Sequence, residues 1–160
     1  FAYFIGLILK GYPELLDQAY KELSFSGSEG SKIIFLNAIW FAETEQSREL
    51  LTRAMVDWNT PTIVESAQWL LNNNPVNPLA LNEIDQDVLN LLWANFFVTG
   101  EKAPVVKIIS TLAYMDQKNM NKMLTAGVAQ GALVTNCKQD EVVKKICKEQ
   151  LRRAKGLVKK

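Results

Sequence analysis

The residue types available for chemistry in this chain are limited, because the sequence contains no histidine. Without histidine there is no imidazole base, no Ser–His or Cys–His pair and no imidazole metal ligand. Acid–base chemistry would depend on two groups of carboxylates: Glu43, Glu45 and Glu49, and Glu83, Asp85 and Asp87. Both groups lie where helices are expected to begin, so we interpret them as helix-start charges and surface. We therefore predict a non-enzymatic protein with no catalytic residue, no cofactor and no metal site.

The two cysteines, Cys137 and Cys147, are the remaining candidates for covalent chemistry. Alone they cannot supply the four ligands of a structural zinc site. A disulfide would require Cys137 to lie in the turn between two helices, because bonded cysteines have Cα atoms within about 7 Å. Two reduced thiols are the favoured interpretation, and a disulfide is the alternative, which would indicate an envelope or secreted location.

The elements that must position these residues are helices. Apolar residues recur at helical spacing through most of the chain, whereas strand-like alternation is lacking. We predict an all-α fold of about eight helices packed as antiparallel helical hairpins, either a bundle or a short α-solenoid.

Local signals mark where several helices begin and end. Thr60 and Pro61 suit an N-cap and a first turn, Asp85 suits an N-cap, and Gly100 suits a left-handed C-terminal residue. Residues 24–31, SFSGSEGS, are rich in Gly and Ser and are predicted to form a loop.

The length of 160 residues fits a single domain, residues 1–160. Residues 72–82, NNNPVNPLALN, interrupt the helical pattern with two prolines and five asparagines. This connector divides the chain into candidate subdomains 1–71 and 83–160.

Two glycines, Gly127 and Gly131, lie one turn apart inside the helix predicted over residues 118–135. Glycine in mid-helix costs roughly 1 kcal/mol relative to alanine. We expect the close approach of a neighbouring helix to offset this cost.

Charge is distributed unevenly along the chain. Residues 1–137 hold 9 Lys and Arg against 14 Asp and Glu, a net of −5, whereas residues 138–160 hold 9 against 3, a net of +6. The last helix is therefore basic and amphipathic, with an apolar stripe from Val143 to Val158 expected to dock on the bundle. An anionic partner would contact its basic residues, and the candidates are Lys144, Lys145, Lys148, Arg152 and Arg153. Binding to nucleic acid is not favoured, because no second basic element or RNA-binding signature accompanies this helix.

Aromatic residues are the basis of the functional hypothesis. Trp93, Phe96, Phe97 and Trp69 are candidates for an apolar groove, because partly exposed aromatic side chains make good interface contacts. We predict a protein–protein interaction module with an unidentified protein partner. The alternative is a small-molecule or lipid carrier, in which aromatic rings and three methionines line a cavity; these are Met115, Met120 and Met123. A third hypothesis is that the basic last helix binds an anionic surface, and homo-oligomerisation stays open.

One resemblance concerns residues 84–151. DVLNLLWANFFVTGEKAPVVKIISTL, followed by a small-residue helix and TNCKQDEVVKKICKEQL, resembles a family of uncharacterised bacterial all-helical proteins. In that family a Trp-containing helix ends in FFxTG before a second short apolar helix. The resemblance implies a bacterial origin and an all-α fold, and it implies no activity and no site residue.

The compartment is not indicated by any targeting signal. The first residues, FAYFIGLIL, lack a basic leading region and a cleavage site, and they fall short of the ~20 residues that cross a bilayer. We expect no transmembrane segment and expect further residues upstream of Phe1. A cytoplasmic location is favoured over a periplasmic or secreted one.

Overall fold

The computed structural model describes the backbone of residues 1–157 and the side chains of residues 1–155. Over this range the chain forms nine α-helices and one 3₁₀-helix, with no strand, so the predicted all-α fold is confirmed. The elements are α1 (Ala2–Gly11), α2 (Leu15–Ser26), α3 (Glu29–Ala42), α4 (Glu45–Asp57), α5 (Pro61–Asn72), α6 (Gln86–Thr99), α7 (Lys102–Ser110), η1 (Thr111–Asp116), α8 (Met120–Gln139) and α9 (Glu141–Leu157).

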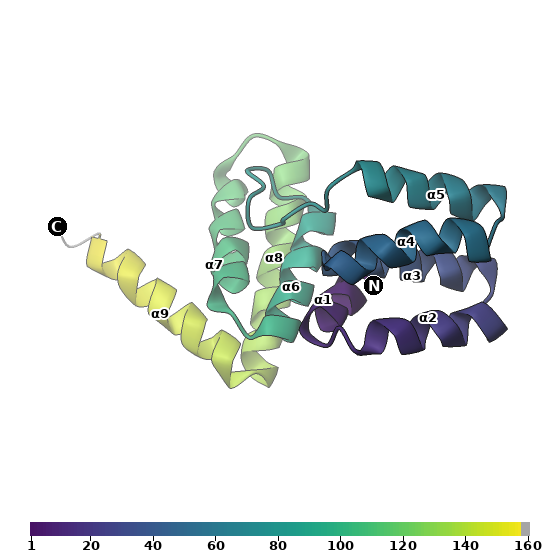
Figure 1. The fold of residues 1–160 in the computed structure, drawn as a ribbon. Coiled ribbons are helices and arrows are strands. Elements are labelled where there is room, and N and C mark those ends of the chain that lie inside the picture. Colours follow the sequence, from purple (N-terminus) through teal and green to yellow (C-terminus); the bar gives the residue numbers. More distant parts are fainter. Residues whose placement is uncertain (158–160) are drawn as a thin grey trace. The chain divides into compact units, whose positions relative to one another are not determined.

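The chain divides into two compact units, and each has its own apolar core (Figure 1). Unit 1 spans Phe1–Val76 and contains α1 to α5, whereas unit 2 spans Asn77–Lys160 and contains α6 to α9. The boundary falls inside the connector predicted over residues 72–82. The division into subdomains 1–71 and 83–160 stays a prediction.

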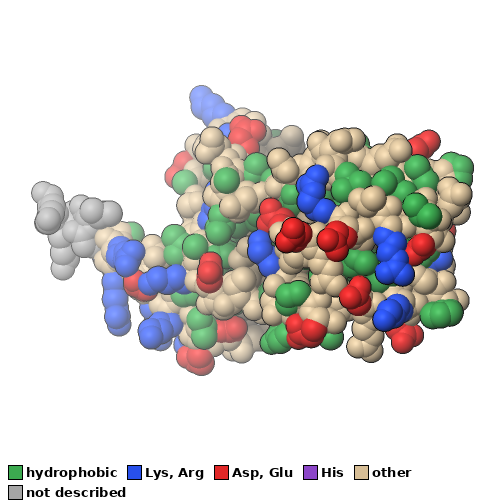
Figure 2. All heavy atoms as spheres, in the orientation of Figure 1, with side chains coloured by type: hydrophobic (Ala, Val, Ile, Leu, Met, Phe, Trp, Pro, Cys, Tyr) green, Lys and Arg blue, Asp and Glu red, His purple; other side chains and the backbone are tan. Residues whose placement is uncertain are grey.

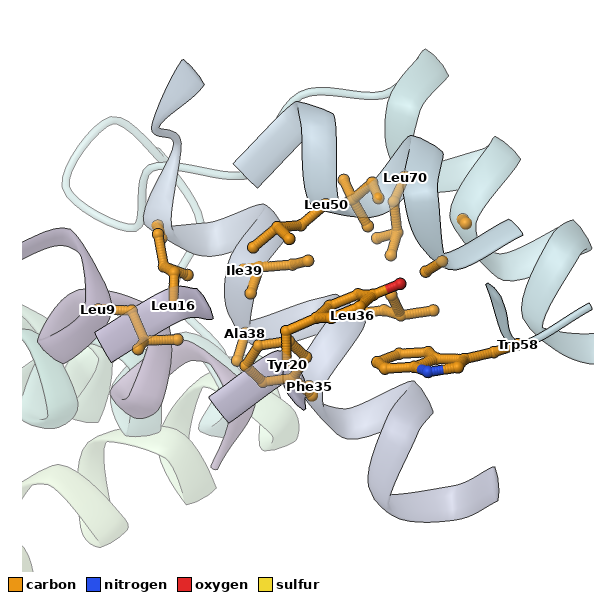
Figure 3. Packing of buried hydrophobic residues seen from close by; sticks show 14 of the residues in the cluster. Leu9, Leu16, Tyr20, Phe35, Leu36, Ala38, Ile39, Leu50, Trp58 and Leu70 are labelled. Atoms are coloured by element: carbon orange, nitrogen blue, oxygen red, sulfur yellow. The ribbon is translucent and has the colours of Figure 1, made fainter. Parts of the chain in front are cut away.

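Helix α3 lies at the centre of unit 1, where it packs against α1, α2, α4 and α5. Its buried residues include Leu36, Ala38 and Ile39, which are fully shielded from solvent. Figure 3 shows these side chains among others from α1, α2, α4 and α5. Tyr20 from α2 stacks on Trp58 beyond the end of α4, with ring centroids 4.6 Å apart. A central position is what an apolar helix such as IIFLNAIWFA is expected to take.

The core of unit 2 is built by α6, α7, α8 and α9. Leu92, Val105 and Ile108 are its most fully buried side chains from α6 and α7. The connector is fixed to this unit by Lys107, whose Nζ donates to the carbonyl oxygens of Leu79 and Leu81, both at 2.6 Å. The irregular backbone before α6 thus obtains partners for its polar groups from α7.

Helix ends agree with most of the predicted local signals. Asp85 caps α6 by accepting from the Val88 N–H at 2.8 Å, and Gly100 ends it with φ 69° in the left-handed region. Thr60 caps α5 in the predicted way. The loop predicted over residues 24–31 is wrong at both ends, because α2 continues to Ser26 and α3 begins at Glu29, directly after its N-cap Ser28. The Ser28 side chain accepts from the Ser31 N–H, which lets the helix begin within the Gly/Ser-rich stretch.

No helix in the part of the chain that the structure describes is long and apolar enough to cross a membrane.

Candidate functional site

The last helix, α9, docks on unit 2 with only its first half. Val143 and Ile146 are buried in the core of the unit, where α9 packs against α7 and α8. From Leu151 to Lys155 every side chain is exposed, and α9 runs outward beyond α7 in Figure 1. The expectation that the whole apolar stripe docks is therefore wrong for its second half. Val158 lies outside the described residues.

An open groove of about 660 Å³ lies where α9 leaves its neighbours. Its walls come from α7 and η1, from the second half of α8 and from both halves of α9. Leu151 is the largest exposed apolar side chain of α9 here, with 57% of its surface accessible. The lining is mostly apolar, and it consists of Ile109, Leu112, Gln130, Leu133, Val134, Cys137, Lys138, Lys144, Cys147, Gln150, Leu151 and Ala154.

The two cysteines face each other in the wall of this groove. Their Sγ atoms are 3.1 Å apart, and both thiols are half-buried. Cys137 lies inside α8. This differs from the sequence-based expectation that a disulfide would require this residue to lie in the turn between two helices. The thiols still meet because Asp140 alone separates α8 from α9. Burial raises the pKa of the Cys147 thiol to about 12, and the hydrogen bond with Cys137 adds to this.

The junction of α8 and α9 is held by short polar contacts. Asp140 Oδ1 accepts from the backbone N–H groups of Val142 and Val143, at 2.7 and 3.1 Å, so it caps α9. On the other side of α9, Lys102 Nζ from α7 lies 3.3 Å from Glu149 Oε2. Lys102, followed by Arg153, holds the pKa of the Glu149 carboxyl below its usual range. These contacts cap the start of α9 and link its middle to α7.

The five predicted basic residues all lie on α9, but they do not form one uniform surface. Lys145, Lys148 and Arg152 line one depression together with Lys144, Glu141 and Glu149. Figure 2 shows Lys and Arg side chains gathered along this helix. Lys144 Nζ is 2.6 Å from Glu141 Oε1, and it also reaches the wall of the groove.

Arg153 points to a different carboxylate, because its Nη2 lies 2.6 Å from Glu149 Oε1. Within the described part of α9, Lys145, Lys148 and Arg152 have no acidic partner. Of the five predicted residues, these three are therefore the ones whose charge is not paired within the described chain.

The structure brings together three of the four predicted aromatic residues. Trp93 stacks on Phe97 with ring centroids 5.7 Å apart, and Phe96 meets both rings. Trp93 and Phe96 are buried in the core of unit 2, so they serve packing, whereas Phe97 is exposed. Trp69 belongs to unit 1, where its exposed ring lies beside Trp40.

Unit 1 has a smaller hollow of about 320 Å³ between α3, α4 and the end of α5. Its polar groups are largely satisfied by the chain itself. Trp40 Nε1 donates to the carbonyl oxygen of Asn73 at 2.9 Å, and Arg48 Nη2 donates to that of Leu71 at 3.2 Å. This hollow therefore offers a ligand fewer free partners than its polar lining suggests.

The described residues contain no candidate metal site. No group of three or more Cys, Asp and Glu side chains converges among them in a way that could hold a metal ion. The groove beside α9 is mostly apolar, and Lys138 and Lys144 belong to its lining. Sequence reasoning identified the stripe of α9 and both cysteines, but it missed the opposite wall formed by Ile109, Leu112, Leu133 and Val134.

Comparisons with protein-family models, with curated proteins and with solved structures gave no match. The resemblance of residues 84–151 to a bacterial helical family stays a prediction.

Proposed function

We propose that this protein is a helical interaction module, and that the groove beside α9 binds an acidic amphipathic helix of another protein. The observation that carries the proposal is the open apolar groove bordered by lysines. Helices bind such grooves through apolar side chains at positions i, i+3, i+4 and i+7, so a row of apolar wall residues is what the partner requires.

The exposed half of α9 supports a helical partner. Leu151 and Ala154 continue the stripe that buries Val143 and Ile146, but the core of the unit ends before it reaches them. A partner helix lying along α9 would cover the exposed second half of this stripe, in the way that α7 and α8 cover its first half. Covering apolar surface stabilises such a complex by about 25 cal/mol per Å² before the cost of association.

Charge indicates that the partner is acidic. Lys138 and Lys144 stand at the groove itself, and Lys145, Lys148 and Arg152 lie on the adjoining face of α9. Carboxylates flanking the apolar positions of a partner helix would meet these cations. Such complementarity guides association and excludes basic partners, and it weakens as salt screens the charges.

The test uses two synthetic helices with leucine at positions i, i+3, i+4 and i+7, one with glutamate and one with lysine elsewhere. Fluorescence anisotropy should detect binding of the acidic peptide to the full chain. The affinity should fall as the salt concentration rises. Leu151→Asp should weaken binding at least about tenfold, as expected at the centre of an interface. Val142→Asp is the matched control, because Val142 is exposed on α9 but does not line the groove.

Equal binding of both peptides would contradict the proposed charge selection, and unchanged binding by Leu151→Asp would contradict the groove. Retention of a lipid in native mass spectrometry, displaced by neither peptide, would favour a carrier. The methionines expected around a carrier cavity, Met115, Met120 and Met123, are instead exposed.

A second candidate function rests on three cations of α9 that form no ion pair with the described residues. Lys145, Lys148 and Arg152 form a basic face that could bind an anionic membrane surface. Vesicles containing phosphatidylserine, compared with neutral phosphatidylcholine vesicles, test this directly in a sedimentation assay. Lys145→Glu with Lys148→Glu should then abolish binding, whereas Leu151→Asp should weaken only peptide binding.

A further inference from the structure

Helix α8 carries an exposed seam at coiled-coil spacing. Its members follow one another at intervals of four, three, four, three and four residues, which is the spacing of heptad positions a and d. All of them are exposed in unit 2, including Met120 with 68% and Leu124 with 56% of their surface accessible. The seam consists of Met120, Leu124, Gly127, Gly131, Val134 and Lys138.

The two glycines at the centre of the seam face open space. No heavy atom of the described chain lies within 4 Å of the position that a Cβ would take at Gly127 or Gly131. The expectation that a neighbouring helix approaches these glycines is therefore wrong within the chain. Nothing in the described part of the chain packs here to offset the cost of glycine in mid-helix, and a second helix packed closely here would do so.

Charge on this face favours an identical partner over an oppositely charged one. From Met123 to Cys137 the helix contains no charged residue, so two copies of the seam can meet without repulsion. The basic α9 could not pair with itself in this way. An uncharged centre is compatible with self-association across a two-fold axis, in which each copy contributes the same patch.

We propose that two copies of this chain associate through antiparallel packing of α8 against α8. In this register Gly127 of one copy faces Gly131 of the other, and Leu124 faces Val134. Lys138 then lies at the beginning of the other copy's α8. Glu83 is close to that level, because its Oε1 lies 3.8 Å from Lys122 Nζ, and its side chain is 87% exposed. In a parallel pair Lys138 would instead face Lys138, and the helix dipoles would align unfavourably.

The size of the seam sets the expected strength. A helix of 20 residues is about 30 Å long, so one pair of such helices buries less than the roughly 1,600 Å² of a standard stable interface. We therefore expect a dimer that dissociates on dilution, with a dissociation constant on the order of micromolar. The inference goes beyond the proposed partner helix, although both surfaces use Val134 and Lys138.

Analytical ultracentrifugation of the full chain over a range of concentrations tests the dimer. Gly127→Gln with Gly131→Gln should raise the dissociation constant at least about tenfold. The same change should leave the monomer at least as stable, because both positions are open and glutamine favours helix. Val142→Asp on α9 is the control and should leave dimerisation unchanged, because Val142 does not belong to the seam.

Orientation is tested by a nitroxide label at Met120→Cys in a chain that also carries Cys137→Ser and Cys147→Ser. In the antiparallel dimer the two labels lie 18 residues apart along the helices, which is roughly 27 Å. Parallel helices would place them about 10 Å apart. A monomer at every concentration, a dimer unaffected by the glycine replacements, or the short distance would overturn the proposal. The groove is tested separately by peptide binding. Binding that is lost in Leu151→Asp but kept in the glycine variant would support the groove whatever the outcome for the dimer.

Discussion

Oxidising Cys137 and Cys147 to a disulfide should stabilise unit 2, because the bond would close a short loop across the junction of α8 and α9. The Sγ atoms are 3.1 Å apart, so approach to the bonded distance of about 2.05 Å requires movement of only about 1 Å. Incubation with glutathione disulfide supplies the oxidant. Two cysteine thiols lose two electrons and two protons, and glutathione disulfide is reduced to two glutathione thiols.

The expected magnitude follows from the length of the closed loop. The cysteines are ten residues apart, and the chain-entropy model for such a loop gives about 3 kcal/mol of stabilisation. Amides of α8 and α9 that exchange through unfolding of unit 2 should therefore exchange more slowly by a factor on the order of a hundred. Hydrogen exchange with mass spectrometry measures this segment by segment, so peptides from unit 1 serve as an internal reference.

The pKa of Cys147 adds a dependence on pH. Burial raises this pKa to about 12 from an ordinary 9.0, so the nucleophilic thiolate of Cys147 is scarce at neutral pH and its attack should accelerate as pH rises. In the reduced protein the folded-state pKa lies above the unfolded value. The protonated Cys147 thiol therefore contributes to the stability of the folded state. The contribution is complete below pH 9 and is lost as pH rises from 9 toward 12.

A chain with Cys137→Ser and Cys147→Ser is the control, and glutathione disulfide should leave its exchange rates unchanged. The reasoning would be refuted by accumulation of mixed disulfides with glutathione in place of the internal bond. It would also be refuted by an oxidised protein whose α8 and α9 exchange as fast as they do in the reduced one.

Three further predictions concern stability and are measured by urea unfolding. Leu36→Ala, at a fully buried site in α3, should destabilise unit 1 by about 2–5 kcal/mol. Tyr20→Phe removes a hydroxyl that donates to Asp57 Oδ2 at 3.0 Å and should cost about 1 kcal/mol. Burial, followed by Asp57, raises the pKa of Tyr20 above 10, so stability should fall as pH rises above 10, and less so in the Phe variant. Gly100→Ala should cost roughly 1–2 kcal/mol through its left-handed φ alone, since no atom lies within 4 Å of the new Cβ.

Local signals predicted the helix ends that depend on a single side chain. Asp85 and Gly100 bound α6 as expected, because an N-cap oxygen and a residue without Cβ act within one turn of the chain. The loop predicted over residues 24–31 is wrong because Ser28 acts as a cap, and a count of Gly and Ser residues cannot separate a cap from a loop.

The site was less predictable, because it depends on where neighbouring elements stop. The stripe that begins at Val143 is visible in the sequence, but its docking depends on the extent of α7 and α8. Leu151 is exposed for this reason, although its spacing is as regular as that of Ile146. The same limit applies to Gly127, whose predicted neighbour is not found within the described chain.

The groove and the seam lie on adjoining faces of α8, and this has a thermodynamic consequence. Val134 and Lys138 belong to both surfaces, so a second copy packed on the seam would cover one wall of the groove. A partner helix and a second copy would then exclude each other. Because coupling between two binding events is reciprocal, dimerisation would weaken partner binding by the same factor by which the partner weakens dimerisation. A micromolar dimer is suited to such an exchange, since a partner of similar affinity could displace one copy from the other.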